Sequence, residues 1–281
     1  MRRTIVGERY LEGIGLHSGR PSSLQVRSGA PGSGIVFRVP VGDGLSEIPG
    51  CLDSVVDQRN ATSLGRGGVR VGTVEHFLAC VSMLGLDDLI IDVEGGEPPA
   101  ADGSAAPILE ALEAGETRIA AGPRPEIELR EEVVLKDGAV EVSATPASTL
   151  SVEYTVDFEA KAIGRQTISF SKLDFQTFKE EIAPARTFGF LSDLKSLRAA
   201  GLAGGASLEN VLVIDGDRIV NDSGLRWPDE FVRHKVLDLI GDLALLGAPL
   251  RAHLRVVRGG HAAHHAWMRT LRDRPSAWGW I

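Results

Sequence analysis

The sequence predicts an α+β fold of two similar domains, and three observations lead to this prediction. Each half begins with strand-like alternation and then changes to helical spacing. In each half that helix has a histidine near its start and is followed by another strand-like segment. A linker-like stretch, 120–125, contains two prolines and separates the halves. We therefore expect an N-terminal α+β domain over 1–122 and a C-terminal α+β domain over 126–281, with an insert at about 188–218.

The first half shows strand, turn and helix patterns. Alternating residues indicate strands at Leu24–Arg27 and Ile35–Val39. The glycine-rich turn before them, Gly13–Gly19, lacks the spacing of either phosphate-binding fingerprint. Apolar residues then recur at helical spacing over 72–84, with Thr73 as the expected N-cap. The remaining expected elements are a strand, a loop and a helix: Leu89–Val93, Pro98–Ser104 and Ala106–Ala114.

The second half repeats this order with more elements. We expect strands at Ile127–Leu135, Ala139–Ala144, Leu150–Asp157, Val211–Ile214 and Arg251–Val257. We expect helices at Lys172–Glu181, Leu191–Ala200, Phe231–Leu246 and His261–Arg272. Gly201–Gly205 is expected to be flexible and to belong to the insert.

Charge, cysteine content and hydropathy exclude several classes of protein. The net charge is −8 and no Lys/Arg run offsets it, which argues against a nucleic-acid partner. Cys51 and Cys80 make neither a disulfide framework nor a Cys-based zinc site. The N-terminus lacks the apolar core of a signal peptide, and no apolar run approaches the length of a membrane span. We therefore expect a cytoplasmic protein without an integral membrane segment.

The helix expected at Phe231–Leu246 carries the clearest chemical pattern. His234 and Asp238 are four residues apart and share one helical face, with Asp242 one turn further. An imidazole and a carboxylate at this spacing can chelate one divalent metal ion. The alternative is a solvated i, i+4 pair, which is common on exposed helices.

Other titratable residues can complete such a site. Glu75 and His76 fall in the first turn of the first-half helix, and His261 follows two glycines. Two histidines and one aspartate leave a fourth position open, as in catalytic zinc sites. Glu75 could then accept a proton from water, and His261 could protonate a leaving amine. The alternatives are a solvated first turn, a loop position for His261, and exposed positions for His264 and His265.

Several short motifs occur together along the chain. They are Thr73-Val74-Glu75-His76, Ala185-Arg186-Thr187-Phe188-Gly189-Phe190, His234-Lys235 with Asp238 and Gly241-Asp242, and Gly260-His261. Three further motifs are Gly13–Gly19, Asp102–Ala105 and Asn221–Trp227. In this order they resemble the zinc-dependent UDP-3-O-acyl-N-acetylglucosamine deacetylases of lipid A biosynthesis. The resemblance runs from about Arg3 to about residue 272.

This resemblance implies a fold, a cofactor and a set of roles. In that family two α+β domains, each with helices layered against β-sheets, face each other with the zinc ion and the active site at their interface. The implied zinc ligands are His76, His234 and Asp238, and Fe²⁺ also suits these ligand types. The implied catalytic residues are Glu75 as general base, His261 as general acid, Asp242 as its carboxylate partner, Thr187 at the oxyanion and Lys235 beside the substrate.

The resemblance also implies the substrate, an acylated UDP-amino sugar that loses its N-acetyl group as acetate. Phe158 resembles the aromatic residue that packs on uridine, although Glu159-Ala160-Lys161 follow it here where the family often has His-Pro. The expected substrate-binding residues are Phe158, Phe188, Lys235 and Ser63, with Leu191, Leu194, Leu202 and Val213 along an apolar acyl channel. The alternatives are a non-catalytic nucleotide-sugar-binding paralogue and a deacetylase of a related nucleotide sugar. We expect a monomer.

Overall fold

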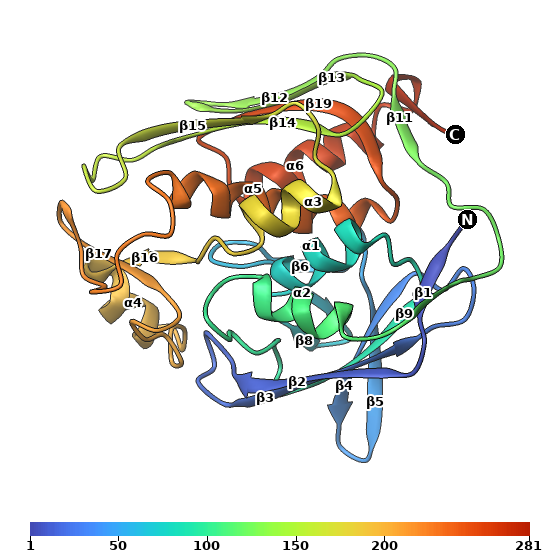
Figure 1. Cartoon of the computed structure of the whole chain (residues 1–281), viewed down its shortest axis with the longest axis horizontal. Coiled ribbons are helices and arrows are strands. Elements are labelled where there is room, and N and C mark those ends of the chain that lie inside the picture. The colour runs from blue at the N-terminus through green and yellow to red at the C-terminus, as the bar shows by residue number, and fades with distance from the viewer.

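Two large β-sheets form opposite outer faces of the molecule, and most of the helices lie between them (Figure 1). The computed structural model describes residues 1–281. The helices are α1 (Glu75–Leu84), α2 (Ala106–Glu113), α3 (Phe175–Thr177), α4 (Leu194–Ala199), α5 (Glu230–Leu243) and α6 (His261–Arg272). This arrangement is the α+β class that the sequence predicts.

The first-half sheet has the strand order β2-β3-β9-β4-β5. Its strands are β2 (Glu8–Ile14), β3 (Pro21–Ser28), β4 (Ile35–Val41), β5 (Gly44–Pro49) and β9 (Leu89–Glu94). The last strand of this sheet along the chain, β9, lies between the hairpins β2-β3 and β4-β5. It runs antiparallel to β3 and parallel to β4.

The second-half sheet repeats this topology in the order β12-β13-β19-β14-β15. Its strands are β12 (Val133–Asp137), β13 (Val140–Pro146), β14 (Ser151–Asp157), β15 (Arg165–Phe170) and β19 (Leu250–Val257), with β11 (Ile127–Leu129) and β20 (Trp278–Trp280) beside β19. Strand β19 is antiparallel to β13 and parallel to β14, as β9 is to β3 and β4. The similar plan expected for the two halves is therefore present.

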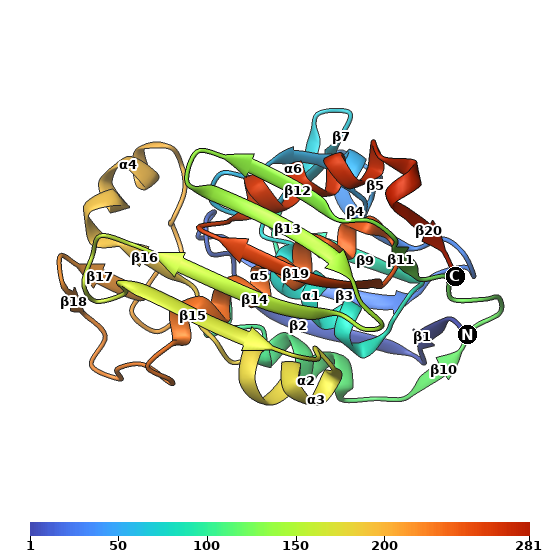
Figure 2. The same cartoon turned by 90° about the horizontal axis from the view of Figure 1, so that it is seen from above.

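Three small sheets complete the fold. They consist of β1 (Arg3–Ile5) with β10 (Thr117–Ile119), of β6 (Val55–Asp57), β7 (Ser63–Arg66) and β8 (Val69–Val71), and of β16 (Phe188–Phe190), β17 (Leu212–Asp215) and β18 (Arg218–Ile219). The sheet β16-β17-β18 and helix α4 lie at the end of the molecule opposite both chain termini (Figures 1 and 2).

One hydrophobic core extends through both halves. Its 55 buried residues include side chains of both large sheets and of the helices between them. On α1 every residue from Glu75 to Val81 is buried, and the apolar residues Phe77, Leu78 and Val81 recur at the expected helical spacing. Burial of this continuous apolar surface is what holds the two halves against each other. No helix in the structure has the length and apolar character needed to cross a membrane.

The structure corrects the expected start of the first helix. Thr73 is not the N-cap: its backbone has φ +51°, and its hydroxyl donates to Glu97 Oε2 at 2.9 Å. Val74 occupies the N-cap position instead and makes no side-chain cap. The hydroxyl of Thr73 is therefore used to hold a neighbouring loop rather than the helix end.

Two expected elements of the second half also differ. The strand expected over Ile127–Leu135 is broken into β11 and β12, because the backbone N–H groups of Arg130 and Glu131 turn away to donate to the carbonyl of Ala277 at 2.7 and 3.2 Å. The helix expected at Lys172–Glu181 starts only at Phe175, and it continues over 178–182 as a π-helical turn. Most strands that were not expected have two to four residues, too short to show a period.

Candidate active site

Helices α1 and α5 bring the two halves together at one buried point. Glu75 and His76 form the first turn of α1, while His234, Asp238 and Asp242 follow one face of α5. All five are at most 8% exposed. The close approach depends on Gly241, because a Cβ added there would lie 2.0 Å from the carbonyl oxygen of Glu75. This burial rules out the solvated-pair alternatives for both helices.

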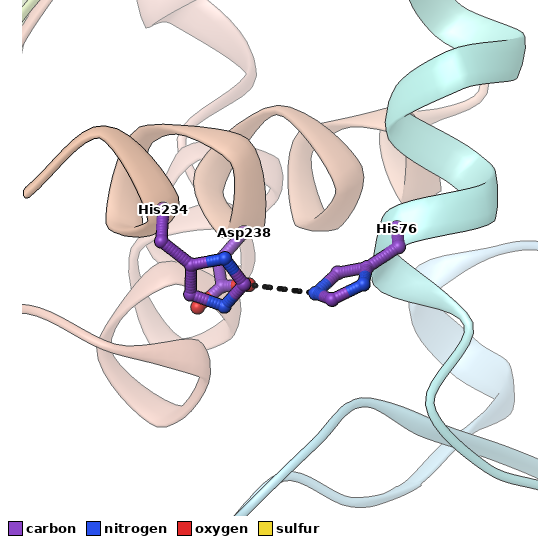
Figure 3. Close-up of side chains that lie close together, drawn as sticks. All are labelled: His76, His234 and Asp238. Carbon is purple, nitrogen blue, oxygen red and sulfur yellow. Dashed lines mark ion pairs between the residues drawn. The ribbon is translucent and has the colours of Figure 1, made fainter. Parts of the chain in front are cut away.

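The spacing of three of these side chains fits a divalent metal ion. His76 reaches from α1 toward His234 and Asp238 on α5 (Figure 3). Asp238 Oδ1 lies 3.7 Å from His76 Nε2 and 3.4 Å from His234 Nε2. Ligand atoms about 2.0–2.2 Å from a tetrahedral ion are about 3.3–3.6 Å apart. The donor set of two imidazoles and one carboxylate therefore suits such an ion in both type and separation.

His234 is held in the form that a metal requires. Its Nδ1 donates to the carbonyl oxygen of Ala185 at 3.1 Å, which leaves the lone pair of Nε2 facing Asp238. Burial lowers the pKa of His234 to about 3, so the imidazole is neutral. The next residue, Arg186, makes a buried bidentate ion pair with Glu230 at 2.8 and 3.1 Å. That pair anchors the segment to which the Ala185 carbonyl belongs.

Asp238 is held as a carboxylate. Its second oxygen, Oδ2, accepts a hydrogen bond from Lys235 Nζ at 2.8 Å. Burial opposes the charge, but the positive charges of Lys235 and His261 outweigh it and hold the pKa of Asp238 well below its usual range. The same pair raises the pKa of Lys235 despite its burial. One oxygen of Asp238 is thus available to a metal ion and the other is tied to a lysine.

A carboxylate and an imidazole face each other beside this cluster. His261 Nε2 lies 3.8 Å from Glu75 Oε1. Burial raises the pKa of Glu75, which makes it a better proton acceptor. Burial opposes the charge on His261, but Asp242 and Asp238 outweigh it and raise its pKa to about 9. At neutral pH the pair therefore combines a base with a protonated imidazolium.

The carboxylate of Asp242 accepts four hydrogen bonds. Its Oδ2 accepts from Nδ1 of His261 and of His264, both at 2.8 Å. Its Oδ1 accepts from Thr62 Oγ1 at 2.6 Å and from His265 Nε2 at 3.1 Å. His264 and His265 are at most 1% exposed, so they are not the exposed polar positions of the alternative interpretation. The carboxylate of Asp242 is fully buried and fixed by these donors.

A cavity of about 620 Å³ opens onto the cluster and extends toward α4. The end nearest the cluster is lined by His76, His234 and Asp238, together with Glu75, Thr187, Lys235 and His261. Its other end is apolar and includes Phe190, Leu191, Leu194, Leu197, Val211 and Val213. The shape and chemistry suit a ligand with one polar, reactive end and one long apolar end.

The sequence matches a known family. The family model described as UDP-3-O-acyl N-acetylglycosamine deacetylase (LpxC) matches residues 2–273. This chain belongs to that family. The function class implied by the sequence motifs is therefore the one that the full-length comparison also reaches.

Curated relatives agree with this assignment. A protein of Myxococcus xanthus named UDP-3-O-acyl-N-acetylglucosamine deacetylase is 43% identical over 280 residues, which cover 99% of this chain and 88% of that protein. A protein of the same name from Phenylobacterium zucineum is 41% identical over 279 residues, covering 99% and 95%. A third, from Syntrophotalea carbinolica, is 38% identical over 268 residues, covering 95% and 86%.

The structure places the remaining expected site residues in two cavities. Phe158 and Phe188 line the 620 Å³ cavity, with ring centroids 5.7 Å apart. Lys235 Nζ lies 5.4 Å from the centroid of the Phe188 ring. Ser63 and Leu202 line a neighbouring, more polar cavity of about 300 Å³ rather than the first. The expected acyl-channel residues are therefore divided, with Leu202 apart from the other three.

Several residues of the site were not expected from the sequence. Two residues of the site are oriented by groups that the sequence did not indicate. His234 is oriented by the carbonyl of Ala185, which the Arg186–Glu230 ion pair holds in place, and Asp242 is oriented by the hydroxyl of Thr62. Arg186 belongs to the motif 185–190, so its place next to Thr187 could have suggested a role in the site. Thr62 lies in a loop between two short strands, where spacing carries no information about its partners.

Proposed function

We propose that the chain is a metal-dependent deacetylase that hydrolyses the N-acetyl group of UDP-3-O-acyl-N-acetylglucosamine, an early step of lipid A biosynthesis. The reaction breaks the amide C–N bond, adds the oxygen of water to the carbonyl carbon, and releases acetate and a free 2-amine. Family membership supports the substrate class. The observation that carries the proposal is the buried base and imidazolium, Glu75 and His261, beside a metal-type ligand set at the end of a half-apolar cavity.

We propose that His76, His234 and Asp238 hold zinc, with Fe²⁺ as the alternative metal. When bound, the ion supplies Lewis-acid polarisation of the acetamide carbonyl and lowers the pKa of water. The neutral His234 and the charged Asp238 support this role, since both must be deprotonated to act as ligands.

We assign the proton transfers to two residues. Glu75, whose Oε2 is oriented by the backbone N–H of Thr62 at 3.0 Å, takes a proton from the attacking water. His261, kept charged by Asp242, gives a proton to the leaving amine. Thr187 and Lys235 line the cavity at this end, where we propose that they stabilise the oxyanion and contact the substrate.

The rest of the substrate follows the cavity. We propose that Phe158 and Phe188 contact the sugar nucleotide, and that Leu191, Leu194 and Val213 line the acyl chain. Ser63 and Leu202 contact the substrate from the adjoining polar cavity. We retain as proposals a monomeric, cytoplasmic protein and a division into domains at 1–122 and 126–281 with an insert at about 188–218.

Acetate release from UDP-3-O-acyl-N-acetylglucosamine, followed by mass spectrometry on zinc-loaded protein, tests the function. We expect Glu75→Gln to abolish most turnover while retaining the metal, and Glu128→Gln, a partly exposed position on β11, to behave as wild type. Absence of turnover in the wild type, with retained binding of the nucleotide sugar, would favour a binding paralogue. A preference for unacylated or differently acylated UDP-sugars would favour a related substrate.

A further inference from the structure

Thr62 lies between the short strands β6 and β7 and is fully buried. Its backbone is tied to the start of α1 by two hydrogen bonds. Its N–H donates to Glu75 Oε2 at 3.0 Å, and its carbonyl accepts from the N–H of Val74 at 3.2 Å. The main chain of Thr62 therefore fixes the carboxylate to which we assign the role of base.

The side chain of Thr62 reaches the other half of the molecule. Its hydroxyl donates to Asp242 Oδ1 at 2.6 Å and lies 3.3 Å from His261 Nδ1. A carboxylate can rotate about the bond that joins it to its side chain, so donors to both oxygens are needed to fix its plane. His261 and His264 bind one oxygen, and Thr62 makes the shorter of the two contacts to the other. The hydroxyl thus orients the carboxylate that in turn orients His261.

We propose, on the basis of the function above, that Thr62 is a positioning residue. It holds the base Glu75 and the acid His261 in the orientations that the two proton transfers require. It touches neither substrate nor metal. Its backbone N–H acts directly on Glu75, and its hydroxyl acts on Asp242, the carboxylate that binds His261. These two contacts of Thr62 link Glu75 on α1 with Asp242 on α5, which belong to different halves of the chain.

Two substitutions separate the hydroxyl from the backbone contact. Thr62→Val keeps the shape and the N–H but removes the donor, and Thr62→Ser keeps the donor. We expect Thr62→Val to lower kcat by about 10- to 100-fold, the value of one hydrogen bond to a charged group, with KM and zinc content unchanged. Thr62→Ser should recover most of the rate. Thr62→Ala, which adds no apolar bulk, should match Thr62→Val and serves if the valine variant folds poorly.

Thr4→Val is the matched control. Thr4 is 1% exposed and its hydroxyl donates to the carbonyl of Asp88 at 2.7 Å, remote from the site. It should lower thermal stability without changing kcat. An equal loss of kcat in Thr4→Val and Thr62→Val would overturn the proposal, because the effect would then be one of general packing.

A second readout does not need the substrate. In protein labelled with ¹⁵N-histidine, the proton between His261 Nδ1 and Asp242 reports on this hydrogen bond, and His261→Gln assigns its signal. We expect the signal to shift or broaden in Thr62→Val and Thr62→Ala but not in Thr62→Ser or Thr4→Val. An unchanged signal in folded Thr62→Val would overturn the proposal. If the wild type released no acetate, the proposed function would fail, while this signal would still decide the role of Thr62.

Discussion

Helices α1 and α5 occupy equivalent places in the two halves, yet they contribute to the site in different ways. Each precedes the central strand of its sheet, β9 or β19. Helix α5 presents three residues along one face, at intervals of four, whereas α1 presents two adjacent residues from its first turn. The α5 contribution is fixed within one helix. The α1 contribution depends on how the two helices dock, and this difference can be tested.

The largest effects should come from removing one proposed metal ligand on each helix. We expect His76→Ala and Asp238→Ala each to lose stoichiometric zinc, and to lower kcat/KM by at least about a thousandfold, since a Lewis acid supplies several kcal/mol. Asp238→Ala should also lower thermal stability more than His76→Ala, because it leaves Lys235 without its partner. Elemental analysis, acetate release and thermal unfolding measure these outcomes. Full zinc occupancy in either variant would contradict the shared site.

The next effect concerns the docking of the two helices. Gly→Ala inside a helix normally stabilises it by about 1 kcal/mol. At Gly241 we expect the opposite sign, a loss of about 1–3 kcal/mol, because the new methyl group would press on the carbonyl of Glu75. Zinc affinity and kcat should fall together as α1 moves away from α5. Denaturant unfolding and chelator competition test this, and a stabilised, fully active Gly241→Ala protein would show that the contact is not needed.

A smaller effect should follow from disturbing the hydrogen bond that orients His234, a proposed metal ligand on α5. We expect Glu230→Gln to weaken zinc binding by about 10- to 100-fold, since it disturbs Arg186 and with it the Ala185 carbonyl that orients His234. Chelator competition measures the affinity. The control is Arg233→Lys, on the same helix, whose guanidinium pairs with more exposed carboxylates. Equal zinc affinity in Glu230→Gln and wild type would remove the proposed link to His234.

The smallest effect near neutral pH should be that of pH on the intact protein. Because the pKa of His261 is raised to about 9, the imidazolium persists below that pH and is lost as pH rises through it. We expect kcat to fall about tenfold per pH unit above this limit, and to fall also at acid pH, where the base Glu75, whose pKa is raised by burial, gains a proton. Asp242→Asn should move the limit toward the ordinary histidine value of 6.5. If the basic limb of the pH–rate profile were the same in both proteins, His261 would not be the acid that protonates the leaving amine.

Most of the long periodic elements were predictable from the sequence, although the six-residue strands β5 and β15 were not expected, and the short elements were mostly missed. Helices α5 and α6 and strands β9, β14 and β19 lie close to their expected bounds, because a repeated apolar spacing is a local property. Strands of two to four residues contain too few positions to show a period. Thr73 has the residue type of an N-cap, but Glu97 competes for its hydroxyl from 24 residues away. Propensity there gave way to a tertiary hydrogen bond.

By itself the sequence determined that His234, Asp238 and Asp242 share one helical face, since the rise and turn of a helix fix that relation locally. The motifs also indicated Glu75, His76 and His261. Tertiary structure alone decided that α1 meets α5 at Gly241, that His264 and His265 are buried against Asp242, and that Thr62 binds a carboxylate 180 residues away. Such contacts arise from the packing of one shared core, and residues so far apart in the chain carry no spacing that could reveal them.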